Sequence, residues 1–473
     1  MRKKDKYQYL LQNTLLFTIA SIGTSLISFF LLPLYTAALS TDSFGVVDLL
    51  DVSSLLLFYI VSLDFSDVVG RFSLDDSLHK PMVLRIAIDF LIKTGTLAAA
   101  AILIASIVDV FHWECRYYLY LLLLYAGTAT SLTLSQYLKG IDKVPVITIA
   151  SIAAAVTKLG AALVLLFGLH MGIDGYVFAN LLGMAVSILI YLYGMRGQAV
   201  FERHIDPVLR QAMIRYTLPL AVNALGWWIA QGVDKYFVTY FHGYSTNGIY
   251  SVAYKLPSVI TILCNIFTQA FYLSAVKEIG SKERGAFFNK TFGAYHTLLC
   301  IACSMLILCN VWFTDLLFPE SYFHAWRCAP WLILSSMFTG FSGYFGGLCD
   351  AVKQTRVLAA STLLSAAINI LLDFLLIPRY GMEGAAVATM VSVYVVFLIR
   401  YLYIRKALQV RFAPLKEHAV FGLLIVQTLL ELQEDHFYWA QCLVTCAILL
   451  ICQRDMRELM QRAVSLLPHR KEH

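Results

Sequence analysis

The stretch NALGWWIAQGVDKYFV, residues 223–238, places an aspartate and a lysine side by side inside an apolar run. The run extends over about residues 213–240, which is long enough for a bilayer-spanning helix of about 20 residues. A charge at the bilayer centre costs about 2.5–3.5 kcal/mol on insertion scales. Asp234 and Lys235 therefore need a partner or water inside the membrane, and we expect them to mark a functional position.

The whole chain has the composition of a polytopic membrane protein. Of its 473 residues, 59% are hydrophobic and 14% are charged, whereas a soluble domain has about 45–50% apolar and about 25% charged residues. The polar segments between the apolar runs are too short to form a separate soluble domain. The net charge of +6 lies mostly in loops, so it indicates membrane topology and does not indicate nucleic-acid binding.

Motifs for catalysis or for metal binding are not convincing in this sequence. The ten cysteines are scattered mostly through apolar runs, and the C-x-x-C of Cys300 and Cys303 has no second pair beside it. We therefore expect small buried thiols. Gly-rich phosphate loops and Ser-His-Asp sets also lack a suitable context. The sequence predicts no catalytic residue, no cofactor and no metal.

The apolar runs predict an all-α fold with about fourteen transmembrane helices. The basic stretch MRKKDK before the first run resembles the start of a signal peptide. The run that follows is longer than a signal peptide needs, so we expect an uncleaved first span. The approximate limits of the spans are 12–35, 44–64, 82–108, 116–138, 144–168, 174–196, 213–240, 247–277, 286–314, 326–350, 356–377, 383–404, 417–431 and 437–453.

Basic residues occur in every second loop along the chain. The turns LSTDSFG, GLHMGIDG and HGYSTNG contain no lysine or arginine. By the positive-inside rule, the basic loops and both termini are cytoplasmic, in a multi-pass protein of the cytoplasmic (inner) membrane. The most basic segments in the second half are the loop after the eighth span (Lys277, Lys282, Arg284, Lys290), the loop after the twelfth (Arg405, Lys406, Arg411, Lys416) and the tail (Arg454, Arg457, Arg462).

Glycine positions reveal an internal repeat. The pair Gly23 and Gly45 has the same spacing as the pair Gly226 and Gly248, and STDSFGVV matches GYSTNGIY. The segment GLHMGIDGYVFAN resembles IPRYGMEGAAVAT, which aligns Gly172 and Gly175 with Gly381 and Gly384, a further set of matched positions.

Each repeat holds six spans, so both repeats begin on the same side of the membrane. We expect two six-helix lobes related by a parallel pseudo-two-fold axis along the membrane normal, with a cleft between them and alternating access by rocking. The predicted parts are an N-terminal lobe at 1–200, a C-terminal lobe at 201–410, and two extra transmembrane helices with a cytoplasmic tail at 411–473.

Three blocks of the sequence resemble a known family. They are LLQNTLLFTIASIGTSLISFFLLPLYTAALSTDSFGVVDL, KLGAALVLLFGLHMGIDGYVFANLLG and LPLAVNALGWWIAQGVDKYFVTYFHGYSTNGIYSVAYKLPSVI. Together they resemble the bacterial polysaccharide (O-antigen and capsule type) flippases of the multidrug/oligosaccharidyl-lipid/polysaccharide flippase superfamily. The family usually has Asp-Arg where this chain has Asp234-Lys235. The block LDFSDVVGRF resembles a family block ending in Arg-Phe, but Asp64 and Asp67 stand where small residues are usual.

The resemblance implies a carrier of undecaprenyl-diphosphate-linked oligosaccharide repeat units, which moves them from the cytoplasmic to the outer leaflet. The implied partners are this lipid-linked oligosaccharide, the membrane, and a glycan polymerase and glycosyltransferases of the same pathway. Nucleic acid is not an expected partner, and the protein is not expected to be an enzyme.

Charged and polar residues inside the spans are the candidate substrate-binding residues. The cations would meet phosphate, Asp234 would hold them in place, and the amides would meet sugar hydroxyls. Each has a structural alternative: Arg71 as an interfacial topology charge, Asp234 as a counter-charge, and the amides as bridges between helices. The candidates are Arg71, Lys158, Lys235, Lys255, Asp234, Asn223, Gln231, Asn265 and Gln269.

Two further sets favour a structural role. Arg85, Asp89 and Lys93 are spaced four apart and predict an ion-pair row along one helix. Asn369 and Asp373 lie one turn apart, where helix packing is favoured over a cation site.

Two other functions compete with the flippase. A drug or metabolite antiporter of the same superfamily would share the lobes and the cleft. A membrane polysaccharide polymerase or glycosyltransferase would carry a sizeable outer loop or domain with catalytic carboxylates, and the outward turns here are short.

Overall fold

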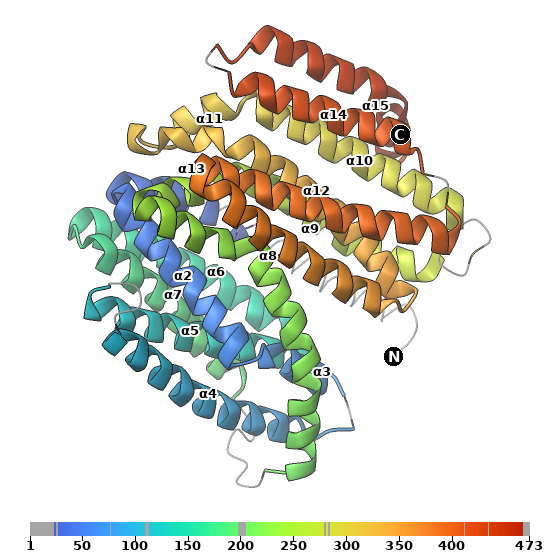
Figure 1. The fold of residues 1–473 in the computed structure, drawn as a ribbon. Helices are drawn as coiled ribbons and strands as arrows, with labels where there is room; N and C mark the ends of the chain where they lie inside the picture. The colour runs from blue at the N-terminus through green and yellow to red at the C-terminus, as the bar shows by residue number, and fades with distance from the viewer. Residues whose placement is uncertain are drawn as a thin grey trace, which may run out of the picture. The chain divides into compact units, whose positions relative to one another are not determined.

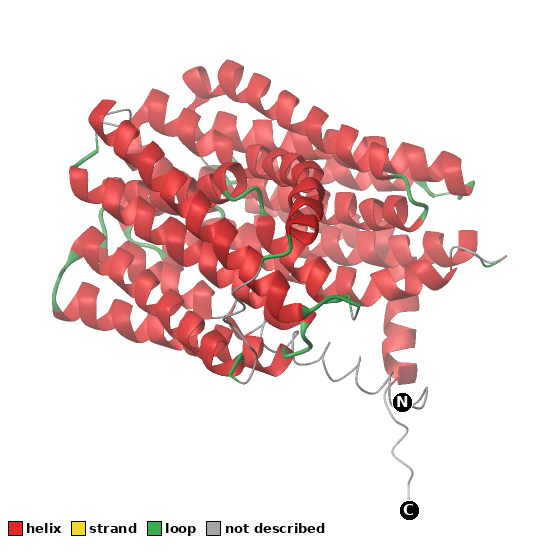
Figure 2. Cartoon of the chain, turned by 90° about the horizontal axis from the view of Figure 1, so that it is seen from below, coloured by secondary structure: helices red, strands yellow, loops and turns green. Residues whose placement is uncertain are grey.

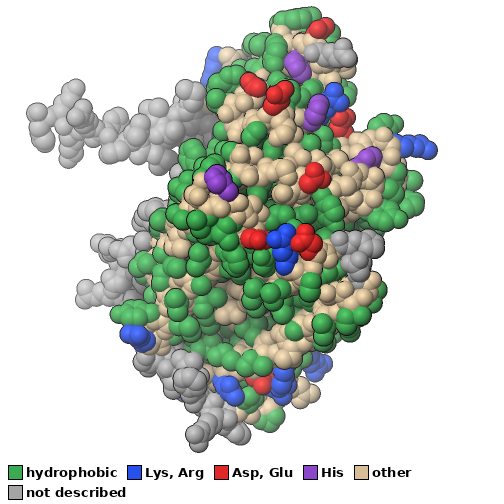
Figure 3. All heavy atoms as spheres, turned by 90° about the vertical axis from the view of Figure 1, so that its left-hand side faces the viewer, with side chains coloured by type: hydrophobic (Ala, Val, Ile, Leu, Met, Phe, Trp, Pro, Cys, Tyr) green, Lys and Arg blue, Asp and Glu red, His purple; other side chains and the backbone are tan. Residues whose placement is uncertain are grey.

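The computed structural model describes residues 23–24, 27–75, 77–108, 113–196, 205–278, 281, 284–410, 412–433 and 435–466. Helices and their connecting turns make up these ranges, and no strand occurs within them (Figure 2). The predicted all-α class is confirmed. One face of the molecule is covered largely by hydrophobic side chains, as a bilayer-embedded surface requires (Figure 3).

The chain divides into two compact units. Unit 1 comprises Met1–Thr239 and Gly243–Gly248, and unit 2 comprises Tyr240–His242 and Ile249–His473. The three-part division at residues 200 and 410 stays a prediction. Unit 1 contains α2 (Thr41–Val61), α3 (Phe65–Ser73), α4 (Lys80–Val108), α5 (Cys115–Gly140), α6 (Val144–Ala162), the π-helical turn η1 (Leu163–Gly168), α7 (Gly172–Gly194) and most of α8 (Pro207–Ala253) (Figure 1).

Unit 2 begins at the end of α8 and includes the C-terminal helices. In it α14 and α15 pack against each other and against α10 (Figure 1). Its elements are α9 (Lys255–Glu278), α10 (Arg284–Leu308), α11 (Asn310–Leu317), the 3-10 helix η2 (Glu320–Arg327), α12 (Ala329–Ala351), α13 (Thr355–Leu408), α14 (Pro414–Glu431) and α15 (Tyr438–Leu466).

Nine helices among the described residues are long and apolar enough to cross a membrane. The protein is a multi-pass membrane protein, but the expected number of fourteen spans is not confirmed. Part of the difference is continuity: α13 runs through two predicted spans and is interrupted only at Gly381, and α8 is interrupted at Gly243. Much of the first predicted span lies outside the described residues, and α14 and α15 are not among the nine.

Glycines that the repeat pairs share their local geometry. Gly172 and Gly381 both have φ of +57°, a left-handed conformation that glycine adopts without strain. A Cβ on Gly175 would lie 3.3 Å from the backbone carbon of Leu165, and one on Gly384 would lie 2.8 Å from that of Leu376. Both turns therefore bring two segments of backbone close together: a Cβ would be tight at Gly175 and would clash at Gly384.

Gly45 and Gly248, which occupy matching positions in the two repeats, form a reciprocal contact inside unit 1. A Cβ on Gly45 would clash with the carbonyl oxygen of Tyr244, and a Cβ on Gly248 would clash with that of Thr41. Gly45 thus lies against Tyr244, four residues before Gly248, and Gly248 lies against Thr41, four residues before Gly45. A contact in which i meets j and j meets i has two-fold form, which the repeat predicts for this pair. The arrangement of whole lobes about an axis stays a prediction.

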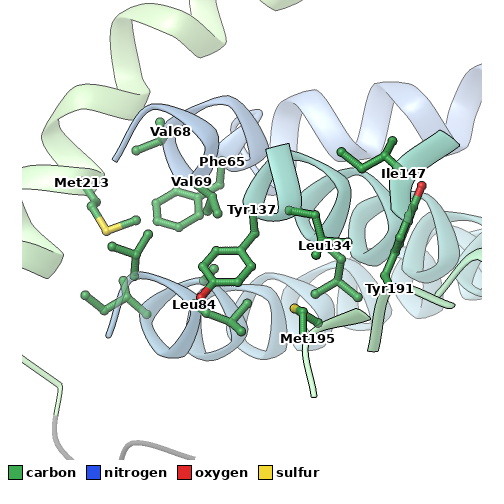
Figure 4. Packing of buried hydrophobic residues seen from close by; sticks show 14 of the residues in the cluster. Phe65, Val68, Val69, Leu84, Leu134, Tyr137, Ile147, Tyr191, Met195 and Met213 are labelled. Atoms are coloured by element: carbon green, nitrogen blue, oxygen red, sulfur yellow. The ribbon is translucent and has the colours of Figure 1, made fainter. Parts of the chain in front are cut away.

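One hydrophobic core cluster of unit 1 lies at one end of its helices. Phe65, Val68 and Val69 of α3 pack against α4 and α5, and Tyr137 is fully buried between them (Figure 4). Met213 of α8 and Met195, after α7, close the same cluster. This packing fixes α3 and α4 against α5, the helix that also packs against α2 and α7.

Candidate functional site

A buried ion pair in unit 1 answers the question raised by residues 223–238. The Nζ of Lys235 on α8 lies 2.7 Å from Oδ1 of Asp48 on α2. The two side chains are 13% and 14% exposed, so the charges are largely withdrawn from solvent. Asn247 donates from Nδ2 to Oδ2 of Asp48 at 3.3 Å and to the carbonyl oxygen of Gly45 at 3.2 Å. The glycine crossing therefore holds Asn247 and Asp48 together.

A second set of charges lies one turn further along α2. The hydroxyl of Tyr176 on α7 donates to Oδ2 of Asp51 at 2.6 Å. The Nζ of Lys158 on α6 lies 6.0 Å from the ring centre of Tyr35 and is close enough to Asp51 for electrostatic attraction. Among the described residues Lys158 makes no hydrogen bond, so its ammonium is held by charge and by the ring face.

Local sequence explains why these groups meet. Asp48 and Asp51 are three residues apart, which puts both on one face of α2. The N-cap Ser40 accepts from the backbone N–H of Ser43 at 3.2 Å and fixes the start of that helix. On α8, Tyr236 follows Lys235, and its hydroxyl lies 2.6 Å from Oγ of Ser53 on α2. We call Tyr35, Asp48, Asp51, Lys158, Tyr176 and Lys235 the α2 cluster.

The α2 cluster balances two carboxylates against two ammonium groups. A balanced set offsets part of the desolvation cost that a lone charge would carry. One polar atom is left over: the hydroxyl of Tyr35 is buried without a hydrogen-bond partner among the described residues, and Tyr35 is 4% exposed. Its ring packs edge-on against Tyr176 at 4.6 Å between centres. The cluster thus has donor capacity that the protein itself leaves unused.

Unit 2 holds a buried cation of a different kind. Arg400 on α13 is 3% exposed. Its Nε donates to Oγ of Ser361 at 2.9 Å, Nη1 donates to the carbonyl of Ser342 at 3.1 Å, and Nη2 donates to Oγ1 of Thr362 at 3.0 Å and to the carbonyl of Leu358 at 3.4 Å. The guanidinium joins α12 to both parts of α13 through these hydrogen bonds.

Comparison with known proteins identifies the chain. A family model described as polysaccharide biosynthesis protein matches residues 10–272. The chain belongs to this family. An uncharacterized membrane protein of Methanocaldococcus jannaschii is 21% identical over 277 residues, which cover 55% of this chain and 65% of that protein. The chain thus matches slightly less than two thirds of this curated relative's length.

Solved structures show the same fold at low identity. The lipid II flippase MurJ in an inward closed conformation superposes with a TM-score of 0.69 at 14% identity, covering 94% of this chain and all of that chain. An inward-facing MATE multidrug resistance transporter of the MOP superfamily gives a TM-score of 0.63 at 12% identity, covering 83% of this chain and 94% of that one. The polysaccharide biosynthesis protein described here therefore has a MurJ- and MATE-like fold.

Only some of the predicted site residues meet in this structure. Lys158 and Lys235 both belong to the α2 cluster. Asp234 is 1% exposed, and its Oδ1 accepts from the backbone N–H of Lys235 at 2.9 Å, so the partner of the lysine side chain is Asp48. Lys255 and Asn265 lie in unit 2 on α9, and Asn265 is exposed. The side chains of Asn223, Gln231 and Gln269 lie outside the described part of the chain.

Arg71 lies in another part of unit 1, in the last turn of α3, and is exposed. No hydrogen bond or ion pair between Arg71 and the α2 cluster occurs among the described contacts. Just before α3, burial and then repulsion from Asp67 raise the pKa of Asp64 to about 6. Asp67 in turn accepts from Nε2 of Gln136 at 2.6 Å. The family's Arg-Phe block is therefore an acidic as well as a basic region in this chain.

The structural alternatives were predicted with partial success. Lys93 and Asp89 form the expected ion pair at 2.7 Å, and Arg210 of α8 approaches the same carboxylate at 3.9 Å. Arg85 does not join the predicted row: its Nε is buried without a hydrogen-bond partner among the described residues. Asn369 and Asp373 are 1% and 0% exposed on α13. No group of three or more His, Cys, Asp or Glu that could hold a metal occurs among the described residues.

Sequence reasoning missed four members of the cluster: Tyr35, Asp48, Asp51 and Tyr176. A signal was present, because Asp48 and Asp51 are two acids within an apolar run. Intramembrane acids are as informative as cations, and a search for the counter-charges of Lys158 and Lys235 would have found them.

Proposed function

We propose that this protein is a flippase that carries undecaprenyl-diphosphate-linked oligosaccharide repeat units across the cytoplasmic membrane by alternating access. The product would feed the assembly of a surface polysaccharide of the O-antigen or capsule type. The observation that carries the proposal is the α2 cluster, in which Lys235 forms an ion pair with Asp48 and Lys158 lies near Asp51, in a member of the polysaccharide biosynthesis family.

The chemistry of the cluster suits a diphosphate. A lysine ammonium binds phosphate as a point charge with three rotatable donors. In the empty state Asp48 and Asp51 neutralise Lys235 and Lys158, so no bare cation faces the hydrocarbon. An arriving diphosphate competes with these carboxylates for the ammonium groups. The contact of Lys235 with the carboxylate of Asp48, at 2.7 Å, can then be exchanged for a contact with a phosphate oxygen.

A hydroxyl group of the cluster and aromatic rings on α8 suit the sugars next to the diphosphate. The unused hydroxyl of Tyr35 can donate to a ligand oxygen. On α8 the rings of Trp228 and Tyr236 lie 5.9 Å apart between centres, and aromatic rings provide stacking faces for sugars. The lipid tail would stay in the bilayer while the headgroup passes through the protein.

A second candidate function is a drug or metabolite antiporter, and the MATE-like fold favours it. The two functions differ in the sign of their cargo: a diphosphate needs the lysines of the cluster, whereas a cationic drug would use the carboxylates. Asp48→Asn distinguishes them, because it would remove the binding of a cationic drug but would leave Lys235 available to phosphate.

Glycan export measured in cells tests the proposal. Lys235→Ala should lower export about 10- to 100-fold, because a hydrogen bond to a charged group contributes about 1.5–3 kcal/mol and about 1.4 kcal/mol is tenfold. Lys235→Arg should retain part of the export, because it keeps the charge. Lys93→Ala is the matched control, since Lys93 forms an ion pair of the same 2.7 Å length but is 54% exposed.

Membrane levels of each variant must be measured alongside export. Normal export by Lys235→Ala would overturn the assignment, and so would an equal loss in Lys93→Ala. If Lys235→Ala fails to accumulate, then Asp48→Asn with Lys235→Gln replaces the ion pair by a neutral pair, and its export tests the same assignment.

We also propose that both termini are cytoplasmic. The basis is the alternation of basic and non-basic loops. Cysteine labelling in a background that lacks the exposed Cys115, Cys442 and Cys446 should reach positions 242–247 from outside and positions 282–290 from inside. The reverse labelling pattern would contradict this orientation.

A further inference from the structure

A charged cavity lies in unit 2 where α10, α14 and α15 meet. It has a volume of about 700 Å³. Its cations come from three helices: Lys290 from α10, Lys416 from α14 and Arg454 from α15. These three residues belong to the three basic segments that the positive-inside rule assigns to the cytoplasm. The fold therefore brings residues from three separate basic segments of the sequence to the lining of one cavity.

The carboxylates of the cavity are already engaged. Asp455 forms an ion pair with Lys416 at 2.5 Å and accepts from Oγ1 of Thr297 at 3.3 Å. Glu417 is 5% exposed, and it accepts from the hydroxyl of Tyr401 at 2.9 Å and from the backbone N–H of Ala413 at 3.3 Å. The cavity holds three cations and two acids, so its lining is net positive.

Small residues give an occupant room. Ala286, Gly293 and Ala294 line the α10 side of the cavity. A Cβ on Gly293 would lie 3.7 Å from Oδ2 of Asp455, which is ordinary contact. Larger side chains at this position would occupy the space beside the ion pair, so glycine keeps it open.

The cavity also borders an apolar surface. Ile451 lines it and is 37% exposed, its neighbour Leu450 is 70% exposed, and Leu415, next to Lys416, is 87% exposed. Polar and apolar surfaces thus meet at the start of α14 and the middle of α15. A soluble anion would use only the cations, whereas a lipid would use the cations for its headgroup and the exposed side chains for its acyl chains.

We propose that this cavity binds the phosphate headgroup of an anionic glycerophospholipid from the cytoplasmic leaflet. Basic pockets between transmembrane helices on that side of the membrane suit such headgroups. Lys290 and Arg454 are both exposed at the cavity and would contact the phosphate from two different helices. The bound lipid would fasten α14 and α15 to α10. The site is separate from the α2 cluster and does not depend on the flippase assignment.

Lipid retention by the purified full-length protein tests the proposal. Native mass spectrometry in detergent should show that the protein retains phosphatidylglycerol at least about tenfold more tightly than phosphatidylcholine, because each basic residue near an anionic lipid surface favours binding. Millimolar inorganic phosphate is the second probe. It should leave phosphatidylglycerol bound, and displacement of the lipid by phosphate would assign the site to a soluble anion and overturn the lipid assignment.

Variants locate the binding at the cavity. Lys290→Glu with Arg454→Glu should weaken phosphatidylglycerol retention about tenfold or more. Gly293→Leu should weaken it with no change of charge. The matched control is Arg405→Glu with Lys406→Glu, two exposed basic residues of the last turn of α13 that do not line the cavity. This control should retain the lipid within about threefold of the wild type.

The outcomes distinguish lipid binding at the cavity from non-specific attraction of the lipid to basic residues on the surface. An equal loss in the cavity pair and in the control pair would show non-specific attraction and overturn the proposal. If the charge-reversal pair does not fold, Lys290→Gln with Arg454→Gln and the wild-type comparison of the two lipids carry the test. Lys235→Ala should retain the lipid normally, so failure of the flippase assignment and failure of this site give different results.

Discussion

Arg400 in unit 2 and the lysines of the α2 cluster in unit 1 are both cations inside membrane spans, but their surroundings differ. Arg400 directs four hydrogen bonds to neutral groups on α12 and α13. Lys235 pairs with Asp48, and Lys158 lies over Tyr35 near Asp51. The guanidinium of Arg400 holds helices together, whereas the lysines lie next to carboxylates that an anionic ligand can replace.

The difference teaches how to separate structural from functional charge within a membrane. A cation bonded to several backbone and hydroxyl groups of its own helices cannot leave them without opening the packing. A cation held by a carboxylate can exchange that carboxylate for a phosphate at little structural cost. The number and kind of partners therefore decide the role, and depth in the membrane does not.

The largest expected effect is on stability at Arg400. Arg400→Met should lower the free energy of unfolding by about 2–6 kcal/mol, because four hydrogen bonds contribute about 0.5–1.5 kcal/mol each. Thermal or detergent unfolding of the purified protein measures this. Transport per folded molecule should stay near the wild type, and Arg405→Met, exposed on the same helix, should unfold normally. Loss of transport without loss of stability would show that Arg400 acts in transport and not in helix packing.

Lys158→Ala should show the opposite behaviour. Glycan export should fall about 10- to 100-fold, since the variant loses a charge-assisted contact with phosphate. The free energy of unfolding should fall less than in Arg400→Met, because Lys158 has no hydrogen bond to lose among the described residues and only its attraction to Asp51 is removed. Export and unfolding are measured on the same preparations. A purely destabilising result would remove Lys158 from the site.

Tyr35→Phe should have a smaller effect, which lowers glycan export without lowering the stability of the protein. The hydroxyl is buried without a partner among the described residues, so its removal should leave stability unchanged or raise it by about 1 kcal/mol. Export should fall about threefold if the hydroxyl donates to the cargo, as one uncharged hydrogen bond of about 0.5–1.5 kcal/mol allows. A destabilised variant would show that the hydroxyl has a partner in the folded protein.

Lys93→Ala should have the smallest effect of the four. Lys93 is 54% exposed in its pair with Asp89, and exposed pairs contribute about 0–1 kcal/mol. Export and melting temperature should both stay close to the wild type. A marked loss of export in Lys93→Ala would mean that the length of an ion pair, and not its burial, governs its role.

The sequence predicted the helical segments and the glycine turns well because both depend on local chemistry. Apolar runs such as 82–108 and 144–168 match α4 and the α6–η1 segment closely. Gly172 and Gly381 share a left-handed conformation that few other residues adopt. Where the chain joins or breaks its helices was harder to predict, as the continuous α13 shows.

The candidate site was predicted only in part because partners are chosen by tertiary contacts. The sequence indicated Lys158 and Lys235 as cations within apolar runs. It did not indicate that Asp48, 187 positions from Lys235, would be the counter-charge. The neighbouring Asp234 was considered as a partner, yet adjacent residues on a helix do not face each other. Arg400 was overlooked because a cation in the middle of a span looks alike in sequence whether it packs helices or binds cargo.

The most direct measurement is translocation by the purified protein in proteoliposomes. The cargo is an undecaprenyl-diphosphate-linked oligosaccharide, and the comparison is among the wild type, Lys158→Ala with Lys235→Ala, and Arg400→Met corrected for folded protein. The account predicts translocation by the wild type and by Arg400→Met, and a loss of at least about tenfold in the double lysine variant. Undiminished translocation by that variant would contradict it, as would a wild-type protein that moves cationic drugs but not the diphosphate lipid.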